Sequence, residues 1–251
     1  TNNIESNYTF PEEIQKKFRR WDTLDEMHQY EKEISNELHL INNETGFFKT
    51  LNQIALSDAL TRKFTIRMMG TGSGRFALEI GKTSLQTLLK GNMSSSIHAL
   101  NVIRILQETY GLTIKEANVY KGNATRRDCA NESCDIIVTS PPYLPASSGR
   151  EDYLVGKMIS LKALGLYDDK EEIMTNSVGS MSSQASVSLD SLPKSVSDLY
   201  NWLIKDELRC IKAAPIVAYY NSLKESLKED KRTIKETGTI IYIIGKESVF
   251  Y

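Results

Sequence analysis

The sequence D-I-I-V-T-S-P-P-Y at residues 135–143 decides the fold, because it predicts both a strand and the point where that strand ends. Its short apolar run, Ile136 to Val138, is typical of a buried strand. The two prolines that follow cannot donate ladder hydrogen bonds, and each ring fixes its own φ, so the strand must stop there. A hydroxyl (Ser140), main-chain carbonyls and an aromatic ring (Tyr143) are therefore expected at one strand end, where open α/β sheets bind ligands.

The segment T-S-P-P-Y resembles the (D/N/S)-P-P-(Y/F/W) motif of the amino-methyltransferases. These enzymes move a methyl group from S-adenosylmethionine to an exocyclic amine of a DNA base. The serine form is typical of the cytosine-N4 enzymes, whereas Asp or Asn is commoner in the adenine-N6 enzymes. The resemblance implies that Ser140, Pro141, Pro142 and Tyr143 are catalytic, that S-adenosylmethionine is the cofactor and that DNA is the partner.

These residue types suit that chemistry. An exocyclic amine is a poor nucleophile because its lone pair is delocalised into the ring, and an acceptor for its hydrogens favours a more pyramidal nitrogen and aims the lone pair. Ser140 Oγ and the Pro141 carbonyl are expected to be those acceptors, and Tyr143 is expected to stack on a base extruded from the duplex. The alternative is a Pro-Pro turn after a core strand, with Tyr143 packed in the core.

Cysteine and histidine usage argues against a metal site or a disulfide framework. The chain of 251 residues has three cysteines without a C-x-x-C pair and three histidines that do not cluster with them, which suits a reducing cytoplasm. The sequence shows no signal peptide and no long apolar span, so we expect no membrane association. A net charge of −1 counts against a DNA partner unless the basic residues are segregated.

Residues 1–112 are expected to form a mainly helical segment. One helix is expected to start near Thr9. Three more are expected at residues 23–40, 44–62 and 95–110, and the last of these ends at Gly111. A basic cluster in the first helix consists of Lys16, Lys17, Arg19 and Arg20. It is either a phosphate-contacting patch or, as the commoner case, a solvated helix face.

A G-x-G-x-G pattern at Gly70, Gly72 and Gly74 resembles the loop with which methyltransferases hold the methionine end of the cofactor. Glycine lets the main chain approach a ligand, and a following helix offers free N–H groups to its carboxylate. Residues 65–69 make a poor strand, however, and residues 82–92 are helix-like where a strand with an acidic end should follow.

A second interpretation places the cofactor loop outside this chain. In similar members of the family, a D-P-F-x-G-S-G-T motif precedes a helical segment that resembles residues 10–110. A second methyltransferase chain, or a missing flanking segment, would then supply that loop, and the sequence would be one piece of a longer or split enzyme. Both interpretations remain open.

Residues 113–251 are expected to form the catalytic core, with strands at residues 117–120, 135–139 and 239–244. Gly122 and Asn123 begin a segment that resembles the family's G-D-A, which implies that they bind the adenine side of the cofactor. The alternative is a simple strand-end turn. Arg150 and Lys157 follow the catalytic motif and are candidate DNA contacts.

The remainder of the core is expected to be a loop and a helical region. A Ser-rich stretch at residues 176–197 predicts a surface loop, and target recognition by this loop is a hypothesis that the family suggests. Residues 199–229 are expected to be helical, with a break at Pro215.

Together these patterns predict an α/β protein, and the resemblance implies a Rossmann-like methyltransferase sheet, either complete or incomplete in this chain, with a helical N-terminal insert. The expected function is a site-specific cytosine-N4 DNA methyltransferase of a restriction-modification or phage-defence system in the cytoplasm. Methylation of adenine N6, of RNA or of a protein glutamine are alternatives. A different class of alternative is a catalytically silent methyltransferase-like subunit that binds DNA or a partner chain.

Overall fold

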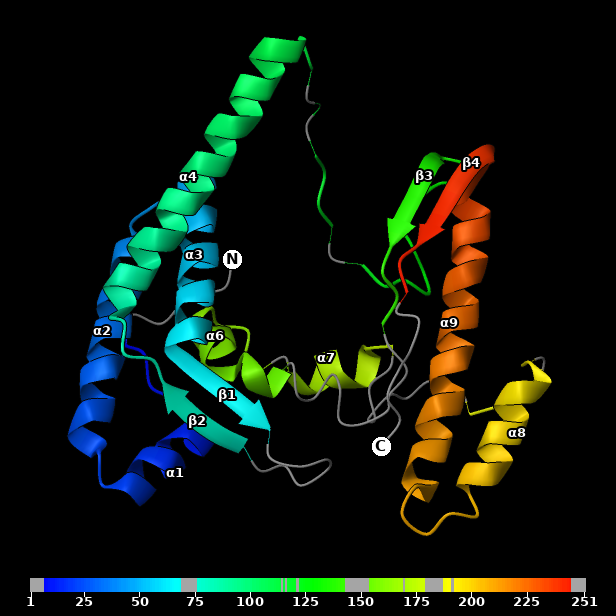
Figure 1. Cartoon of the computed structure of the whole chain (residues 1–251), viewed down its shortest axis with the longest axis horizontal. Coiled ribbons are helices and arrows are strands. Elements are labelled where there is room, and N and C mark those ends of the chain that lie inside the picture. The colour runs from blue at the N-terminus through cyan, green and yellow to red at the C-terminus, as the bar shows by residue number, and fades with distance from the viewer. Residues whose placement is uncertain are drawn as a thin grey trace. The chain divides into compact units, whose positions relative to one another are not determined.

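The computed structural model describes residues 7–68, 76–113, 115, 117–120, 122–142, 154–168, 170–178, 187–190 and 192–244. The chain divides into two compact units, residues 1–117 with 153–170, and residues 118–152 with 171–251. Its elements are mixed α and β, as expected (Figure 1). Residues 153–170, which the sequence assigned to the catalytic core, belong to the first unit.

The first unit is mainly helical. Its elements are α1 (Glu12–Trp21), α2 (Leu24–Asn42), α3 (Gly46–Lys63), β1 (Phe64–Met68), β2 (Phe76–Ile80), α4 (Leu85–Tyr110) and α6 (Met158–Ala163). The expected helices are thus confirmed, although α4 is one continuous helix over the stretch for which the sequence suggested two. Ser84 begins it by accepting a hydrogen bond from the Thr87 N–H at 3.2 Å, and Gly111 ends it with φ of 61°.

Aromatic side chains build the centre of this unit. The ring of Phe10 lies 5.5 Å from that of Phe18 and 5.3 Å from that of Phe64, measured between centroids. All three are buried, and they pack with Ile14 of α1 and aliphatic side chains of α2 and α3. The apolar faces of three helices and the start of β1 therefore share one core.

β1 and β2 form an antiparallel hairpin, which corrects the expectation for the glycine pattern. Phe64 pairs with Ile80 and Met68 with Phe76, so the stretch between them joins two strands and is followed by β2, where a helix was expected. Residues 65–68, which the sequence predicts to be a poor strand, belong to β1 through their ladder with residues 76–79, and the exposed side chain of Arg67 forms an ion pair with Glu79 at 3.1 Å. Gly70, Gly72 and Gly74 themselves lie outside the described residues.

The second unit contains a parallel strand pair. Its elements are β3 (Cys134–Thr139), α8 (Lys194–Leu203), the 3₁₀ turn η1 (Cys210–Lys212), α9 (Ala213–Thr233) and β4 (Ile234–Tyr242), and α7 (Lys170–Asn176) begins at its boundary. β3 and β4 pair in parallel from Ile136 opposite Thr239 to Thr139 opposite Tyr242. The predicted parallel neighbours are confirmed, and α8 and α9 lie in the connection that such a pair requires.

Two strand expectations are wrong for the described residues. Residues 117–120 form no strand, and Val119 and Tyr120 are 92% and 82% exposed. Ile136 and Val138, expected to be buried, are 62% and 60% exposed. The reason in both cases is a lack of neighbouring strands among the described residues. The sheet of β3 and β4 holds only two described strands, and β propensity stabilises a strand only through neighbours.

Boundaries in the helical region also differ from expectation. The break between α8 and α9 lies at residues 204–209, and Pro215 is the third residue of α9, where the first-turn N–H groups have no intrahelical partner in any case. α8 begins at Lys194, within the stretch expected to be a Ser-rich loop. No helix in the described ranges has the length and apolar character needed to cross a membrane.

Gly238 occupies an irregular turn of the strand pair. Cys134 pairs with Ile234 and Ile136 with Thr239, so β4 uses extra residues to match two steps of β3. A Cβ atom on Gly238 would lie 2.7 Å from two side-chain carbons of Ile234 and 2.9 Å from the Asp135 carbonyl. The bulge therefore requires a residue without a side chain.

Candidate functional site

The end of β3 is closed by a serine hydroxyl. The last main-chain contact of the pair joins the Ile243 N–H to the Thr139 carbonyl at 2.9 Å. Ser140 Oγ then donates to the Ile243 carbonyl at 3.0 Å, since a carbonyl can only accept. The hydroxyl hydrogen is used in this contact, and no donor among the described residues contacts the exposed Ser140 Oγ, so its lone pairs are available to accept.

A buried tyrosine holds the turn that follows. Tyr219, on α9, is 8% exposed and donates its hydroxyl to the Pro142 carbonyl at 2.8 Å. Burial, followed by the nearby Tyr220, raises the pKa of Tyr219, so its hydroxyl remains a donor at neutral pH. Only a tyrosine pair on an apolar helix face indicates this contact in the sequence.

The predicted catalytic residues are thus described in part. Ser140, Pro141 and Pro142 lie together with Ile243 and Tyr219, and no donor among the described residues contacts the Pro141 carbonyl. Tyr143 falls outside the described residues, and its stacking role stays a prediction.

The structure describes one of the two predicted DNA contacts. Arg150 is outside the described residues. Lys157 belongs to the first unit, where its Nζ donates to Thr61 Oγ1 at 3.2 Å and borders an open pocket of about 360 Å³ that α3 helps to line. Its role in DNA binding also stays a prediction.

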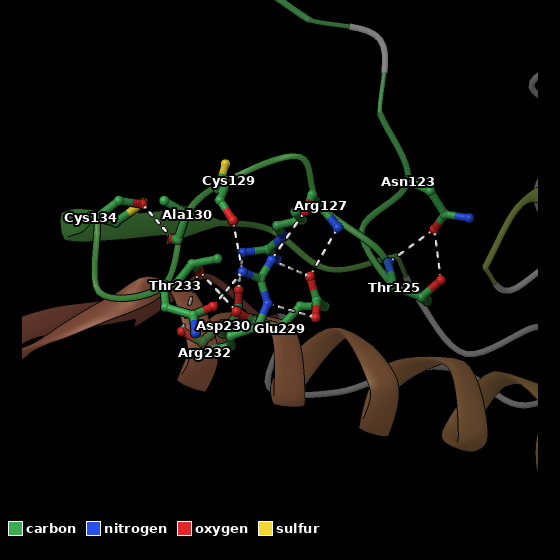
Figure 2. Close-up of polar contacts among 12 residues, drawn as sticks. Asn123, Thr125, Arg127, Cys129, Ala130, Cys134, Glu229, Asp230, Arg232 and Thr233 are labelled. Atoms are coloured by element: carbon green, nitrogen blue, oxygen red, sulfur yellow. Dashed lines mark hydrogen bonds and ion pairs between the residues drawn. The ribbon is translucent and has the colours of Figure 1, made fainter.

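Asn123 forms a local turn. Its side-chain oxygen accepts from the Thr125 N–H at 2.9 Å and from the Thr125 hydroxyl at 2.8 Å, as Figure 2 shows. These two donors occupy the oxygen that was expected to accept from the adenine amine. Gly122 has nothing within 4 Å of the place where a Cβ would lie, so no close approach requires a glycine there.

The described residues therefore do not form a binding site for S-adenosylmethionine. The Asn123 oxygen is already used, and Gly122 lines no cradle. The glycine pattern of residues 70–74 connects two antiparallel strands, not a strand and a helix. The geometry favours the simple-turn interpretation of Gly122 and Asn123 and leaves the cofactor residues unidentified.

Arg232, near the end of α9, fastens the segment that leads into β3 (Figure 2). Its guanidinium forms a bidentate pair with the Glu229 carboxylate: Nε donates to Oε1 at 3.0 Å and Nη2 donates to Oε2 at 2.7 Å. The same group donates to the carbonyls of Arg127 and Cys129 at 3.0 and 2.7 Å, and to Asn131 Oδ1 at 2.8 Å. One side chain thus satisfies acceptors on both segments.

Glu229 and Asp230 complete this latch, which we define as Arg127, Glu229, Asp230, Arg232 and Tyr242. Glu229 accepts from the Arg127 N–H at 2.9 Å. The hydrogen bonds from Arg232 and then from Arg127 lower the pKa of Glu229 to about 2. Asp230, 1% exposed, pairs with the Arg127 guanidinium and accepts from the Tyr242 hydroxyl, so this buried carboxylate has both a charge partner and a hydrogen bond. The latch joins three segments that the sequence did not connect.

The basic cluster of α1 makes contacts within its own unit. Lys16 pairs with Glu12 at 2.8 Å, Lys17 donates to the Phe76 carbonyl at 2.6 Å, and Arg19 donates to Gln15 at 3.2 Å. These contacts favour the helix-face interpretation over a phosphate patch. In the described part of the chain, no group of three or more His, Cys, Asp or Glu side chains could hold a metal ion.

Among protein-family models, curated proteins and solved structures, none matches this chain.

Proposed function

We propose that this chain carries the amine-binding part of an S-adenosylmethionine-dependent DNA amino-methyltransferase, with cytosine N4 as the favoured target. One observation carries the proposal: Ser140 Oγ donates its hydrogen to Ile243 and so presents only acceptor lone pairs at the end of a parallel strand. That is the chemistry needed to hold the hydrogens of an exocyclic amine.

The fold supports this at the level of the strand pair. β3 and β4 are parallel neighbours with α8 and α9 in their connection, as in one part of a Rossmann-like methyltransferase sheet. The first unit corresponds to the helical N-terminal insert that is expected for such a methyltransferase. Ligands of such sheets bind beyond the carboxyl ends of the strands, which is where Ser140 lies.

The proposed work of this chain is binding and orientation. Ser140 Oγ and the Pro141 carbonyl accept the two amine hydrogens, and the proline rings fix that carbonyl in advance. Tyr143 stacks on the extruded base. S-adenosylmethionine would supply the methyl group.

The test is single-turnover methyl transfer to duplex DNA by the protein as its gene encodes it, with the modified base identified by mass spectrometry. A hydrogen bond to a group that gains charge contributes about 1.5–3 kcal/mol, so Ser140→Ala should slow the transfer step roughly 10- to 150-fold. Tyr143→Ala should weaken productive DNA binding about fivefold to over a hundredfold, because stacking contributes about 1–3 kcal/mol. Tyr143→Phe should retain most activity.

Ser133→Ala is the matched control. Its exposed hydroxyl, just before β3, donates to the Ala130 carbonyl at 2.8 Å, so the change also removes a serine-to-carbonyl hydrogen bond but lies at the other end of the strand. Wild-type rates in both Ser140→Ala and Tyr143→Ala would reduce the motif to a turn. N6-methyladenine as the product would retain the mechanism and replace the cytosine assignment.

The use of the Asn123 oxygen by Thr125 favours a second candidate, a catalytically silent methyltransferase-like subunit or one whose cofactor loop comes from another chain. Calorimetry of S-adenosylmethionine with residues 1–251 separates the two. Saturable binding supports a complete active site, and no binding together with retained DNA binding supports the subunit.

A further inference from the structure

Tyr219 is a buried polar side chain of α9, and its hydroxyl forms a hydrogen bond with the proposed catalytic turn. Its hydroxyl reaches the Pro142 carbonyl from a position 77 residues further along the chain. Its ring packs edge-on against Tyr220, with centroids 5.3 Å apart and planes at 80°. The ring is therefore held in place, and the hydroxyl is directed at one main-chain atom.

Among the described residues, two side-chain contacts hold this turn. Pro141 and Pro142 have no N–H groups, so the sheet cannot hold them through ladder hydrogen bonds. Two side-chain contacts flank the Pro141 carbonyl instead: Ser140 Oγ to the Ile243 carbonyl on one side, and the Tyr219 hydroxyl to the Pro142 carbonyl on the other. The proline rings fix φ at both positions, and a hydrogen bond to the Pro142 carbonyl restrains the ψ torsion that φ leaves free.

We propose that Tyr219 is a positioning residue for the amine-acceptor site, and that its hydroxyl holds the Pro-Pro turn in the orientation that the Ser140 and Pro141 acceptors require. This inference rests on the proposed function. Tyr219 does not touch the reacting amine, and its effect passes through the Pro142 main chain. A small displacement of acceptors is costly in such a site because they must meet the amine in a single orientation.

The test compares Tyr219→Phe with Tyr220→Phe in the protein as its gene encodes it. Both changes remove one hydroxyl and keep the ring, so core packing is retained and circular dichroism verifies the fold. Tyr220 lies next to Tyr219 on α9, and the Pro142 carbonyl is bonded to Tyr219 alone of the two.

The first readout does not depend on activity. Proline labelled with ¹³C at the carbonyl gives one signal for each of the six prolines of the chain, and Pro142→Ala identifies the signal of Pro142. Tyr219→Phe should shift the Pro142 signal, and Tyr220→Phe should leave it in place. An unshifted Pro142 signal in Tyr219→Phe overturns the inference.

The second readout is the division between kcat and KM. Tyr219→Phe should lower kcat about 10- to 100-fold, the cost of a misplaced catalytic group, and should change KM for DNA far less. A purely structural role would lower the unfolding midpoint and leave kcat of the folded protein unchanged. A shifted Pro142 signal with a wild-type kcat therefore also overturns the inference.

Failure of the proposed function gives a different result. If the wild-type protein transfers no methyl group to any DNA offered, while Tyr219→Phe still shifts the Pro142 signal, the contact exists but has no reaction to serve. That outcome overturns the proposed function and the positioning role together. An active wild type with an insensitive kcat overturns the positioning role alone.

Discussion

Replacing Gly238 by alanine tests whether the bulge of β4 depends on a missing side chain. The new Cβ would lie 2.7 Å from Cδ1 and Cγ1 of Ile234 and 2.9 Å from the Asp135 carbonyl oxygen. Ile234 can respond only in part, because Cγ1 is next to its own Cβ, and the Asp135 carbonyl belongs to the main chain of β3. Both strands must therefore shift.

Overpacking of this kind costs typically about 1–3 kcal/mol. Alanine also reduces the conformational entropy of the unfolded chain, which stabilises the folded protein by about 0.4–1 kcal/mol. We expect Gly238→Ala to lower the free energy of unfolding of the second unit by about 1.3 kcal/mol, the difference between the midpoints of those two ranges. In a chain of this size, 1 kcal/mol corresponds to roughly 2–4 °C in Tm.

The assay is urea unfolding followed by the fluorescence of Trp202, which lies on α8 in the second unit. The chain has two tryptophans, and Trp21→Phe removes the signal of the first unit. Gly122→Ala, in the same unit, is the control, because nothing lies within 4 Å of its added Cβ. A Gly238→Ala protein as stable as the Gly122→Ala protein would refute the argument from the bulge.

Two further predictions concern charged side chains. The folded-state pKa of Glu229, about 2, is below the value of about 4.3 expected when the chain is unfolded, so its contribution to stability is complete above that value and is lost as pH falls toward 2. The gap in urea midpoint between wild type and Glu229→Gln should shrink over this window, and a gap independent of pH would contradict the role of Arg232. Lys63 is buried and donates to two main-chain carbonyls at 2.7 and 3.1 Å. Lys63→Met should therefore destabilise the first unit by about 1–3 kcal/mol, measured by thermal unfolding, and an unchanged Tm would show that these carbonyls find other donors.

The elements predicted best are those that local chemistry dictates. Two prolines end β3 whatever surrounds it, and Gly111 ends α4 because it alone adopts a left-handed conformation there at no cost. The parallel pairing of β3 and β4 followed from two apolar runs with helices between them. The two stops need no knowledge of distant residues, and the pairing needs only the order of strand, helices and strand along the chain.

The features that were missed depend on partners far away in the sequence. Arg232 contacts residues 101–105 positions earlier, and a charge at the end of a helix gives no sign of which loop it will bind. The hairpin of β1 and β2 was missed because Arg67 looks unsuited to a strand until its partner Glu79 is known. Residues 117–120 have strand-like composition but acquire no neighbour among the described residues.

The spacing of two side chains on α9 has a mechanical consequence. Tyr219, which holds the Pro142 carbonyl, and Asp230, which holds Tyr242, are separated by 11 positions along one helix. At 3.6 residues per turn this is about three full turns, so both side chains point the same way from the helix axis. A one-residue insertion between the two would turn one attachment by about 100° relative to the other, so the Pro142 carbonyl and the Tyr242 hydroxyl, which both lie toward the carboxyl end of the parallel pair, could not be held at once. The surface of α9 can vary, but the number of residues between Tyr219 and Asp230 cannot.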